Sequence, residues 1–169
     1  MNKNSIIWLR RDLRLYDNAA LFHALKDSNQ VFPVFIFDIK ILSELKNKKD
    51  RRIEFILRSL DEIKKSLNEK GSDLIVEMGD PESLIPKLIT EYKCKSLYIN
   101  RDYEKYAKDR DNTISEILSN KEVTTLRFKD QVLFENNEIL TQSNNPYTVF
   151  TPYKNCLLYT SPSPRDVEE

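Results

Sequence analysis

Residues 5–21 read SIIWLRRDLRLYDNAAL, an apolar run, then a charged loop, then the start of a second apolar pattern. The run from Ser5 to Leu9 predicts a short buried strand, and Asp17 or Asn18 is placed to cap a helix that begins near Ala19. The loop between them carries three arginines and two aspartates. Ligands bind at the carboxyl ends of strands in an open α/β sheet, so this position favours recognition. The alternative is a solvent-exposed cluster whose charges neutralise one another.

The same alternation of β-rich runs and amphipathic helical patterns continues to residue 128. We expect strands at 5–9, 31–38, 73–78, 96–100 and 122–128, and helices at 18–27, 50–69, 84–93 and 104–119. This order predicts an α/β fold, a doubly wound five-stranded parallel sheet with helices on both faces. Pro86 falls inside the third helical pattern, so we expect that helix to start late, with Ser83 as its cap and a turn at 79–81.

The composition argues against three kinds of protein: a DNA-binding domain, a metal-binding domain and a membrane protein. The 169 residues include 27 basic and 27 acidic side chains, which leaves no net field to hold DNA, so we expect no direct DNA binding by this chain. Cys94, Cys156 and the single His23 have no metal-ligand spacing, so we expect no metal site. No apolar run approaches the roughly 18 residues of a membrane span. We therefore expect a cytoplasmic monomer that does not enter a membrane.

A second charged loop, residues 100–104 with the sequence NRDYE, follows the fourth expected strand. In the usual doubly wound order the first and fourth strands are neighbours at the point where the order reverses, so both loops face one crevice. That placement makes Arg10, Arg14, Asn100, Asp102 and Glu104 candidates for contact with a ligand. The alternative is that the two acidic residues only favour the N-terminus of the following helix.

Arg51 and Arg52 stand in the first turn of the long expected helix, where cations oppose the helix dipole. Either Asp50, as the cap, or an anionic ligand group could offset this cost. The chain has two glycines, Gly71 and Gly79, so it contains neither a dinucleotide fingerprint nor a P-loop. No nucleophile is paired with a histidine in the sequence pattern, and we predict no catalytic residues.

Three blocks of sequence, in order, resemble the N-terminal α/β domain of the DNA photolyase and cryptochrome family. They are WLRRDLRLYDNAAL at 8–21, NRDYEKYAKDRD at 100–111 and PYTVFTPYKN at 146–155. The resemblance implies a Rossmann-like domain that carries a light-harvesting antenna chromophore. It also implies that FAD binding and the light-driven splitting of cyclobutane pyrimidine dimers belong to a separate helical domain. This chain alone is therefore expected to be inactive.

Within that family, the second block resembles the branch with a deazaflavin or flavin antenna. The resemblance implies that Arg52, Asp102 and Glu104 contact the chromophore, and it gives Arg10 and Arg14 only a structural role. The folate branch has an Asn-Glu pair where this chain has Tyr106-Ala107. Methenyltetrahydrofolate is therefore the less favoured antenna.

The resemblance predicts an α/β domain at 1–128 and the start of an interdomain linker at 129–155. Residues 156–169 depart from the family pattern, and Pro162 and Pro164 exclude a regular helix there, so we expect a disordered or artefactual tail. The leading hypothesis is a fragment of a deoxyribodipyrimidine photolyase whose partner is the helical FAD- and DNA-binding domain. The alternatives are a fragment of a cryptochrome photoreceptor and a stand-alone nucleotide-binding α/β module.

Overall fold

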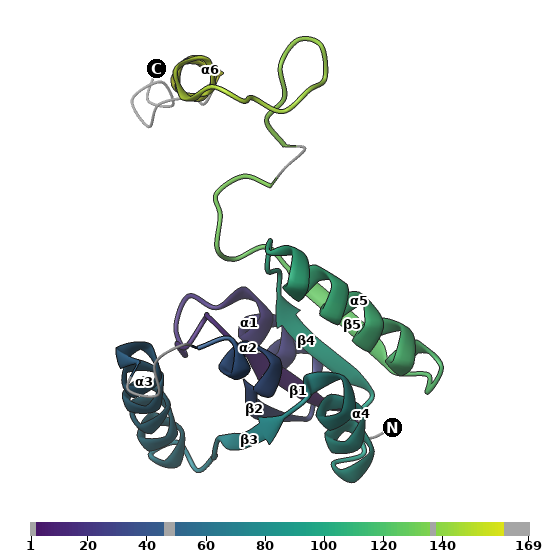
Figure 1. Ribbon diagram of the computed structural model, residues 1–169. Coiled ribbons are helices and arrows are strands. Elements are labelled where there is room, and N and C mark those ends of the chain that lie inside the picture. Colours follow the sequence, from purple (N-terminus) through teal and green to yellow (C-terminus); the bar gives the residue numbers. More distant parts are fainter. Residues whose placement is uncertain (1–2, 46–49, 136–137, 161–169) are drawn as a thin grey trace, which may run out of the picture. The chain divides into compact units, whose positions relative to one another are not determined.

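Five parallel strands form one sheet, with helices packed on its two faces (Figure 1). The structure, a computed structural model, describes residues 3–45, 50–135 and 138–160. The strands are β1 (Asn4–Leu9), β2 (Gln30–Asp38), β3 (Ile75–Gly79), β4 (Ser96–Asn100) and β5 (Thr124–Phe128). The helices are α1 (Ala19–Asp27), α2 (Ile39–Ser43), α3 (Arg51–Asn68), α4 (Pro81–Glu91), α5 (Lys105–Ser119) and α6 (Phe150–Thr160).

The strand order is β3-β2-β1-β4-β5, and every pairing is parallel. In the centre, Ile6 of β1 lies opposite Phe32 of β2 on one side and Leu97 of β4 on the other. The chain runs outward from β1 in one direction and then returns to β4 on its other side. The doubly wound fold is thus confirmed, and the order reverses between β1 and β4.

Alternate residues of the strands supply two hydrophobic cores, one on each face of the sheet. On one face Ile6, Val34 and Leu97 pack with Ile85 of α4 and Ile114 of α5. On the other face, residues such as Ile7, Phe35 and Tyr98 pack with α1 and α3, through Ala20, Leu21, Ala24, Leu60, Ile63 and Leu67. The central strands are apolar at almost every position because both faces are covered.

Local signals explain where α1 and α3 begin and where α3 ends. Asn18 caps α1 by accepting a hydrogen bond from the Leu21 amide at 3.0 Å, and Asp50 caps α3 through the Arg52 amide at 2.9 Å. Gly71 follows α3 with a φ of 73°, a left-handed conformation that favours glycine. The starts of α1 near Ala19 and of α3 after Asp50 are confirmed as expected from the sequence.

The expectation of a late start for α4 is wrong. The helix begins at Pro81, and Asp80 rather than Ser83 is its cap, accepting from the Glu82 amide at 3.1 Å. Proline is well suited to the first helical position because its fixed φ is already helical and its missing N–H has no partner there. Pro86 lies inside the helix and lacks the donor for one internal hydrogen bond.

The chain forms two compact units, residues 1–131 and 132–169. All five strands and α1 to α5 belong to the first unit, and α6 belongs to the second, where the rings of Tyr147 and Tyr153 meet edge to face at 5.9 Å. Residues 156–160 are helical, and residues 161–169 lie outside the described part. The proposed domain boundaries at residues 128 and 155 stay predictions.

Within the described ranges, no helix has the length and apolar character needed to cross a bilayer.

Candidate functional site

A cavity of about 240 Å³ lies at the carboxyl ends of β1 and β2, between α2 and α3 on one side and α5 on the other. Its apolar walls come from ten side chains: Trp8, Phe35, Ile36, Phe37, Ile41, Leu42, Leu45, Ile53, Ile56 and Ala107. Its polar groups are Arg10, Arg11, Asp38, Arg52, Asp102, Glu104, Tyr106 and Arg110. This is the sheet edge at which open α/β folds bind ligands.

The lining residues divide by exposure into a floor and a mouth. Trp8, Ile36 and Ala107 are buried and form the apolar floor. At the mouth, the side chains of Arg11, Glu104 and Arg52 are 54%, 62% and 74% exposed. A ligand that enters this cavity would therefore pass charged groups before it reaches apolar walls.

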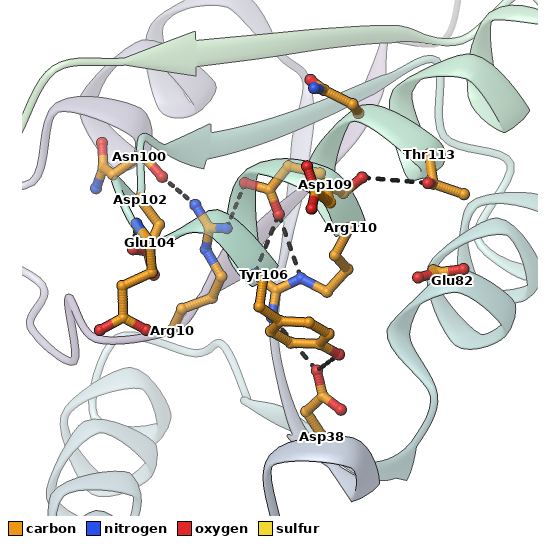
Figure 2. Close-up of polar contacts among 12 residues, drawn as sticks. Arg10, Asp38, Glu82, Asn100, Asp102, Glu104, Tyr106, Asp109, Arg110 and Thr113 are labelled. Atoms are coloured by element: carbon orange, nitrogen blue, oxygen red, sulfur yellow. Dashed lines mark hydrogen bonds and ion pairs between the residues drawn. The ribbon is translucent and has the colours of Figure 1, made fainter.

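Two guanidinium groups lie over the ring of Trp8 in the floor of the cavity. The guanidinium carbons of Arg10 and Arg110 are 5.1 Å and 4.6 Å from the centre of the indole ring. Both arginines also bind Asp111 of α5, with 2.6 Å from Arg10 Nη1 to Oδ2 and 3.1 Å from Arg110 Nη2 to Oδ1. Arg10 reaches further to the backbone carbonyl of Asn100 (Figure 2). This buried cluster attaches the loop after β1 to β4 and α5.

Asp38, the last residue of β2, makes a second set of polar contacts that links the elements around the cavity. Its Oδ2 accepts from the Tyr106 hydroxyl at 2.7 Å and from Arg110 Nη1 at 3.4 Å, as Figure 2 shows, and its Oδ1 caps α2 through the Lys40 amide. Burial, and then the bond to Asp38, raise the pKa of the Tyr106 phenol above its usual value. Tyr106 is therefore a protonated hydrogen-bond donor at neutral pH, and Asp38 joins β2, α2 and α5.

The two charged loops meet as the sequence predicts. Arg11, two residues after β1, places Nη2 2.6 Å from Glu104 Oε2 and Nε 3.4 Å from Asp102 Oδ2. The hydrogen bond with Glu104 is the largest cause of the raised pKa of Arg11. Asp102 and Glu104 line the cavity together with Arg10, so three of the residues predicted from the two loops share this site with Arg11.

Arg52 lies on the α3 side of the cavity, and its charge is balanced by its own helix cap. Its Nη2 is 2.7 Å from Asp50 Oδ2, and Arg52 lowers the pKa of that carboxyl from 3.8 to about 2. Asp50 thus offsets the cation in the first turn, one of the two explanations that the sequence left open. The other, an anionic ligand group, stays compatible with the position of Arg52 in the wall.

Asn100 and Arg14 lie outside the cavity. The buried Asn100 amide donates to Asp12 Oδ2 at 2.6 Å and to Asn18 Oδ1 at 2.8 Å, and its Oδ1 accepts from the Ala20 amide. Arg14 Nη2 lies 2.6 Å from Asp130 Oδ2. The contacts of these two side chains hold the loop after β1, the start of α1 and residue 130 together.

Sequence reasoning missed Asp38, Tyr106 and Arg110 as lining residues. A signal for Asp38 was present, since it is the first polar residue after the apolar run of β2 and so ends at the same sheet edge as the two loops. Tyr106 and Arg110 recur four apart on α5, which places them on one helical face. No cluster of three metal-ligating side chains occurs among residues 3–45, 50–135 and 138–160.

Comparisons of the sequence and of the structure with known proteins both find similarity to photolyases. The family described as DNA photolyase matches residues 5–167. The deoxyribodipyrimidine photo-lyase of a Synechococcus strain is 34% identical over 160 residues, covering 94% of this chain and 33% of that protein. A bacterial class III photolyase from Agrobacterium tumefaciens superimposes with a TM-score of 0.84 at 28% identity, covering 96% of this chain and 33% of that one.

An archaeal photolyase from Sulfolobus tokodaii, whose structure is described as holding two FAD molecules with implication of a novel light-harvesting cofactor, is also similar. Its TM-score is 0.70 at 31% identity, covering 82% of this chain and 32% of that one. The chain thus spans about a third of the length of the relatives it matches.

Proposed function

Because this chain belongs to the DNA photolyase family, we propose that it is the antenna-chromophore-binding domain of a deoxyribodipyrimidine photolyase and that the cavity holds the chromophore. The antenna is the light-harvesting group, which absorbs light and passes the excitation energy on. The family alone does not specify this role. The observation that carries it is the cavity at the carboxyl ends of β1 and β2.

The residues of the cavity fit a flat aromatic ring with polar edges. The walls are mainly aliphatic and aromatic, and polar side chains lie both at the floor and at the mouth, a mixture that suits a small-molecule site. The volume of about 240 Å³ is just below the range of about 300 to 1,000 Å³ that is typical of such sites. We infer that a ring system is enclosed and that any tail extends through the charged mouth.

A flavin or deazaflavin is the chromophore that these residues favour over methenyltetrahydrofolate. Arg52, Asp102 and Glu104, the three positions at which the resemblance implies chromophore contacts, all line the cavity. Their carboxylates and guanidinium group offer acceptors and donors to the imide and carbonyl groups of such a ring. The similar Sulfolobus photolyase, described as holding two FAD molecules with implication of a novel light-harvesting cofactor, supports the proposal of a flavin here.

We propose the repair of cyclobutane pyrimidine dimers only for a photolyase that also contains the FAD- and DNA-binding domain. We do not propose it for these 169 residues alone. Equal numbers of basic and acidic residues give this chain no general attraction for DNA. We therefore expect no light-dependent dimer repair by this chain when free FAD is added.

Titration of the chain with riboflavin, FMN and methenyltetrahydrofolate tests the proposal. We expect saturable quenching of flavin fluorescence, and weaker binding by the variants Arg52→Ala and Asp102→Ala. Arg58→Ala is the matched control, because Arg58 also lies on α3 but pairs with Glu54 and does not line the cavity. Equal flavin affinity in the wild type and both cavity variants would remove these residues from the site, and tighter binding of the folate would contradict the proposed chromophore.

A further inference from the structure

Trp8 is the single tryptophan of the chain, and it lies in the floor of the cavity with 2% of its surface exposed. Indole is one of the side-chain groups that give up an electron most readily. When such a group lies beside an electronically excited aromatic ring, an electron can pass from one to the other, and the absorbed energy is then lost as heat. An unprotected tryptophan at this position would therefore compete with the passing of energy from a light-harvesting group.

Two cations lie over the Trp8 ring and oppose its oxidation. The guanidinium carbons of Arg10 and Arg110 are 5.1 Å and 4.6 Å from the ring centre. Removal of one electron from neutral Trp8 leaves a positive charge on the indole, which both guanidinium groups repel. The two arginine side chains are only 10% and 5% exposed, so solvent and salt screen this repulsion little.

Two carboxylates offset part of this positive charge. Asp111 binds both guanidinium groups, and Asp38 binds Arg110 at 3.4 Å (Figure 2). The carboxylates bind the guanidinium nitrogens, whereas the guanidinium groups themselves lie over the indole. The interaction energy of two charges falls with the distance between them, so we expect the repulsion by the cations to outweigh the attraction by the carboxylates.

The indole N–H is the second reason why Trp8 is hard to oxidise. Trp8 Nε1 is buried, and within the part of the chain that the structure describes it has no hydrogen-bond acceptor. An acceptor at this place would stabilise the positive charge of oxidised Trp8 and could take up the indole proton. Oxidised Trp8 would instead keep both its proton and its full positive charge beside the two guanidinium groups.

We propose that Arg10 and Arg110 make Trp8 a poor electron donor, so that the tryptophan in the cavity floor does not quench an excited ligand beside it. The step that they suppress is the transfer of one electron from the Trp8 indole to the excited ring, which gains that electron, with no bond broken and no proton moved. The inference deepens the proposed function and rests on it for the ligand. The oxidation of Trp8 itself can be measured without any ligand.

The first experiment measures the rate at which Trp8 is oxidised in the full, ligand-free chain. Photogenerated ruthenium(III) tris-bipyridine is the oxidant, at high ionic strength so that its long-range attraction to the chain is screened. The absorption of the tryptophan radical reports on Trp8 alone, and Trp8→Phe gives the background.

Removal of either cation should speed the oxidation of Trp8. A unit charge about 5 Å away, at an effective dielectric constant of about 20, changes an equilibrium by more than about a hundredfold, and the two carboxylates reduce this effect. We therefore expect about tenfold faster oxidation in Arg10→Gln and in Arg110→Gln. Arg110→Lys, which keeps the charge, should stay close to the wild type. Arg58→Gln is the matched control without effect, because Arg58 is exposed on α3 and does not line the cavity.

The variant Asp38→Asn separates the effect of charge from a general loosening of the cavity. Loss of a nearby negative charge should slow the oxidation of Trp8, whereas loosening would speed it in every variant. The arginine substitutions break buried ion pairs, so circular dichroism first establishes which variants fold. Unchanged or slower oxidation in a folded Arg10→Gln or Arg110→Gln protein would overturn the inference. Unchanged or faster oxidation in Asp38→Asn would overturn it even if neither arginine variant folds.

Riboflavin then links Trp8 to the ligand. The fluorescence lifetime of bound riboflavin should be the same in the wild type and in Trp8→Phe, because any quenching on binding has other sources. In Arg110→Gln the lifetime should shorten, and Trp8→Phe in the same chain should restore it. A lifetime that Trp8→Phe alone lengthens severalfold would overturn the inference. If riboflavin does not bind while Trp8 oxidation follows the charges, the tuning of Trp8 is supported and the proposed function is contradicted.

Discussion

Arg10 and Asp111 form a buried ion pair across 101 positions of sequence, with 2.6 Å between Arg10 Nη1 and Asp111 Oδ2. The side chains are 10% and 5% exposed, and Arg110 shares the same carboxylate. The pair fastens the loop after β1 to α5 directly below the cavity. A buried charge that loses its partner is costly, so this contact makes a clear prediction for stability.

Replacing Asp111 with asparagine should lower the free energy of unfolding by about 3 to 5 kcal/mol, because two buried guanidinium groups then lose their shared carboxylate. Urea denaturation followed by circular dichroism measures the change. Asp109→Asn is the matched control, since Asp109 is exposed on the same helix, and it should change stability by less than about 0.5 kcal/mol. Equal stability of the two variants would contradict the structural role of the pair.

Replacing Asn100 with alanine should destabilise the fold by about 2 to 3 kcal/mol while leaving the affinity for riboflavin unchanged. The substitution removes three buried hydrogen bonds, one each to Asp12, Asn18 and the Ala20 amide. Urea denaturation and flavin titration measure the two quantities. Asn120→Ala, at the exposed end of α5, is the control with little expected effect. Loss of flavin binding by a folded Asn100→Ala protein would instead support a direct role in the site.

Tyr106→Phe should lower the free energy of unfolding by about 1 kcal/mol, because Asp38 then loses its shortest side-chain hydrogen bond. The effect is modest because the Tyr106 side chain is partly exposed to solvent. Thermal denaturation checks the change. Tyr16 is 79% exposed, so Tyr16→Phe should leave the stability unaltered. If both substitutions behave alike, the hydroxyl of Tyr106 does not hold Asp38 in place.

Burial raises the pKa of the Cys94 thiol from 9.0 to about 12, which makes stability depend on alkaline pH. Below the unfolded value of 9.0 the thiol is neutral in both states and this contribution to stability is complete. As the pH rises from there toward about 12, the unfolded thiol ionises while the folded one does not, so stability falls.

The variant Cys94→Ala should therefore lose less stability than the wild type when urea denaturation is compared on the two sides of pH 9.0. The slope with pH is the quantity to compare, because the substitution itself also removes buried volume. Tyr98 and Tyr106 have raised pKa values too, so part of the slope should persist. Identical slopes in the two proteins would exclude Cys94 as a source of the pH dependence.

The order of strands and helices could be predicted because it depends on neighbours in the chain. Apolar periodicity, the cap at Asn18 and the glycine at position 71 act within one or two turns, so the expected strands and helices of residues 5–128 were found with shifts at their ends. The short helix α2 (Ile39–Ser43) was not predicted. The start of α4 was misplaced because Pro86 was weighed as a helix breaker, whereas Asp80 and Pro81 together begin the helix earlier. The convergence of the two charged loops followed from the general rule for doubly wound sheets.

The tertiary structure alone decided which charges face the cavity and which serve the fold. The sequence placed Arg10, Arg14, Asn100, Asp102 and Glu104 at one sheet edge, but Arg14 pairs with Asp130 and Asn100 is enclosed by Asp12 and Asn18. The partners of Asp38 are 68 and 72 positions away on α5. Such pairings depend on strand register, helix rotation and the reach of long side chains, which no local pattern encodes. The sequence thus determined the edge of the sheet where a site could form, and packing between distant segments determined the residues that line it.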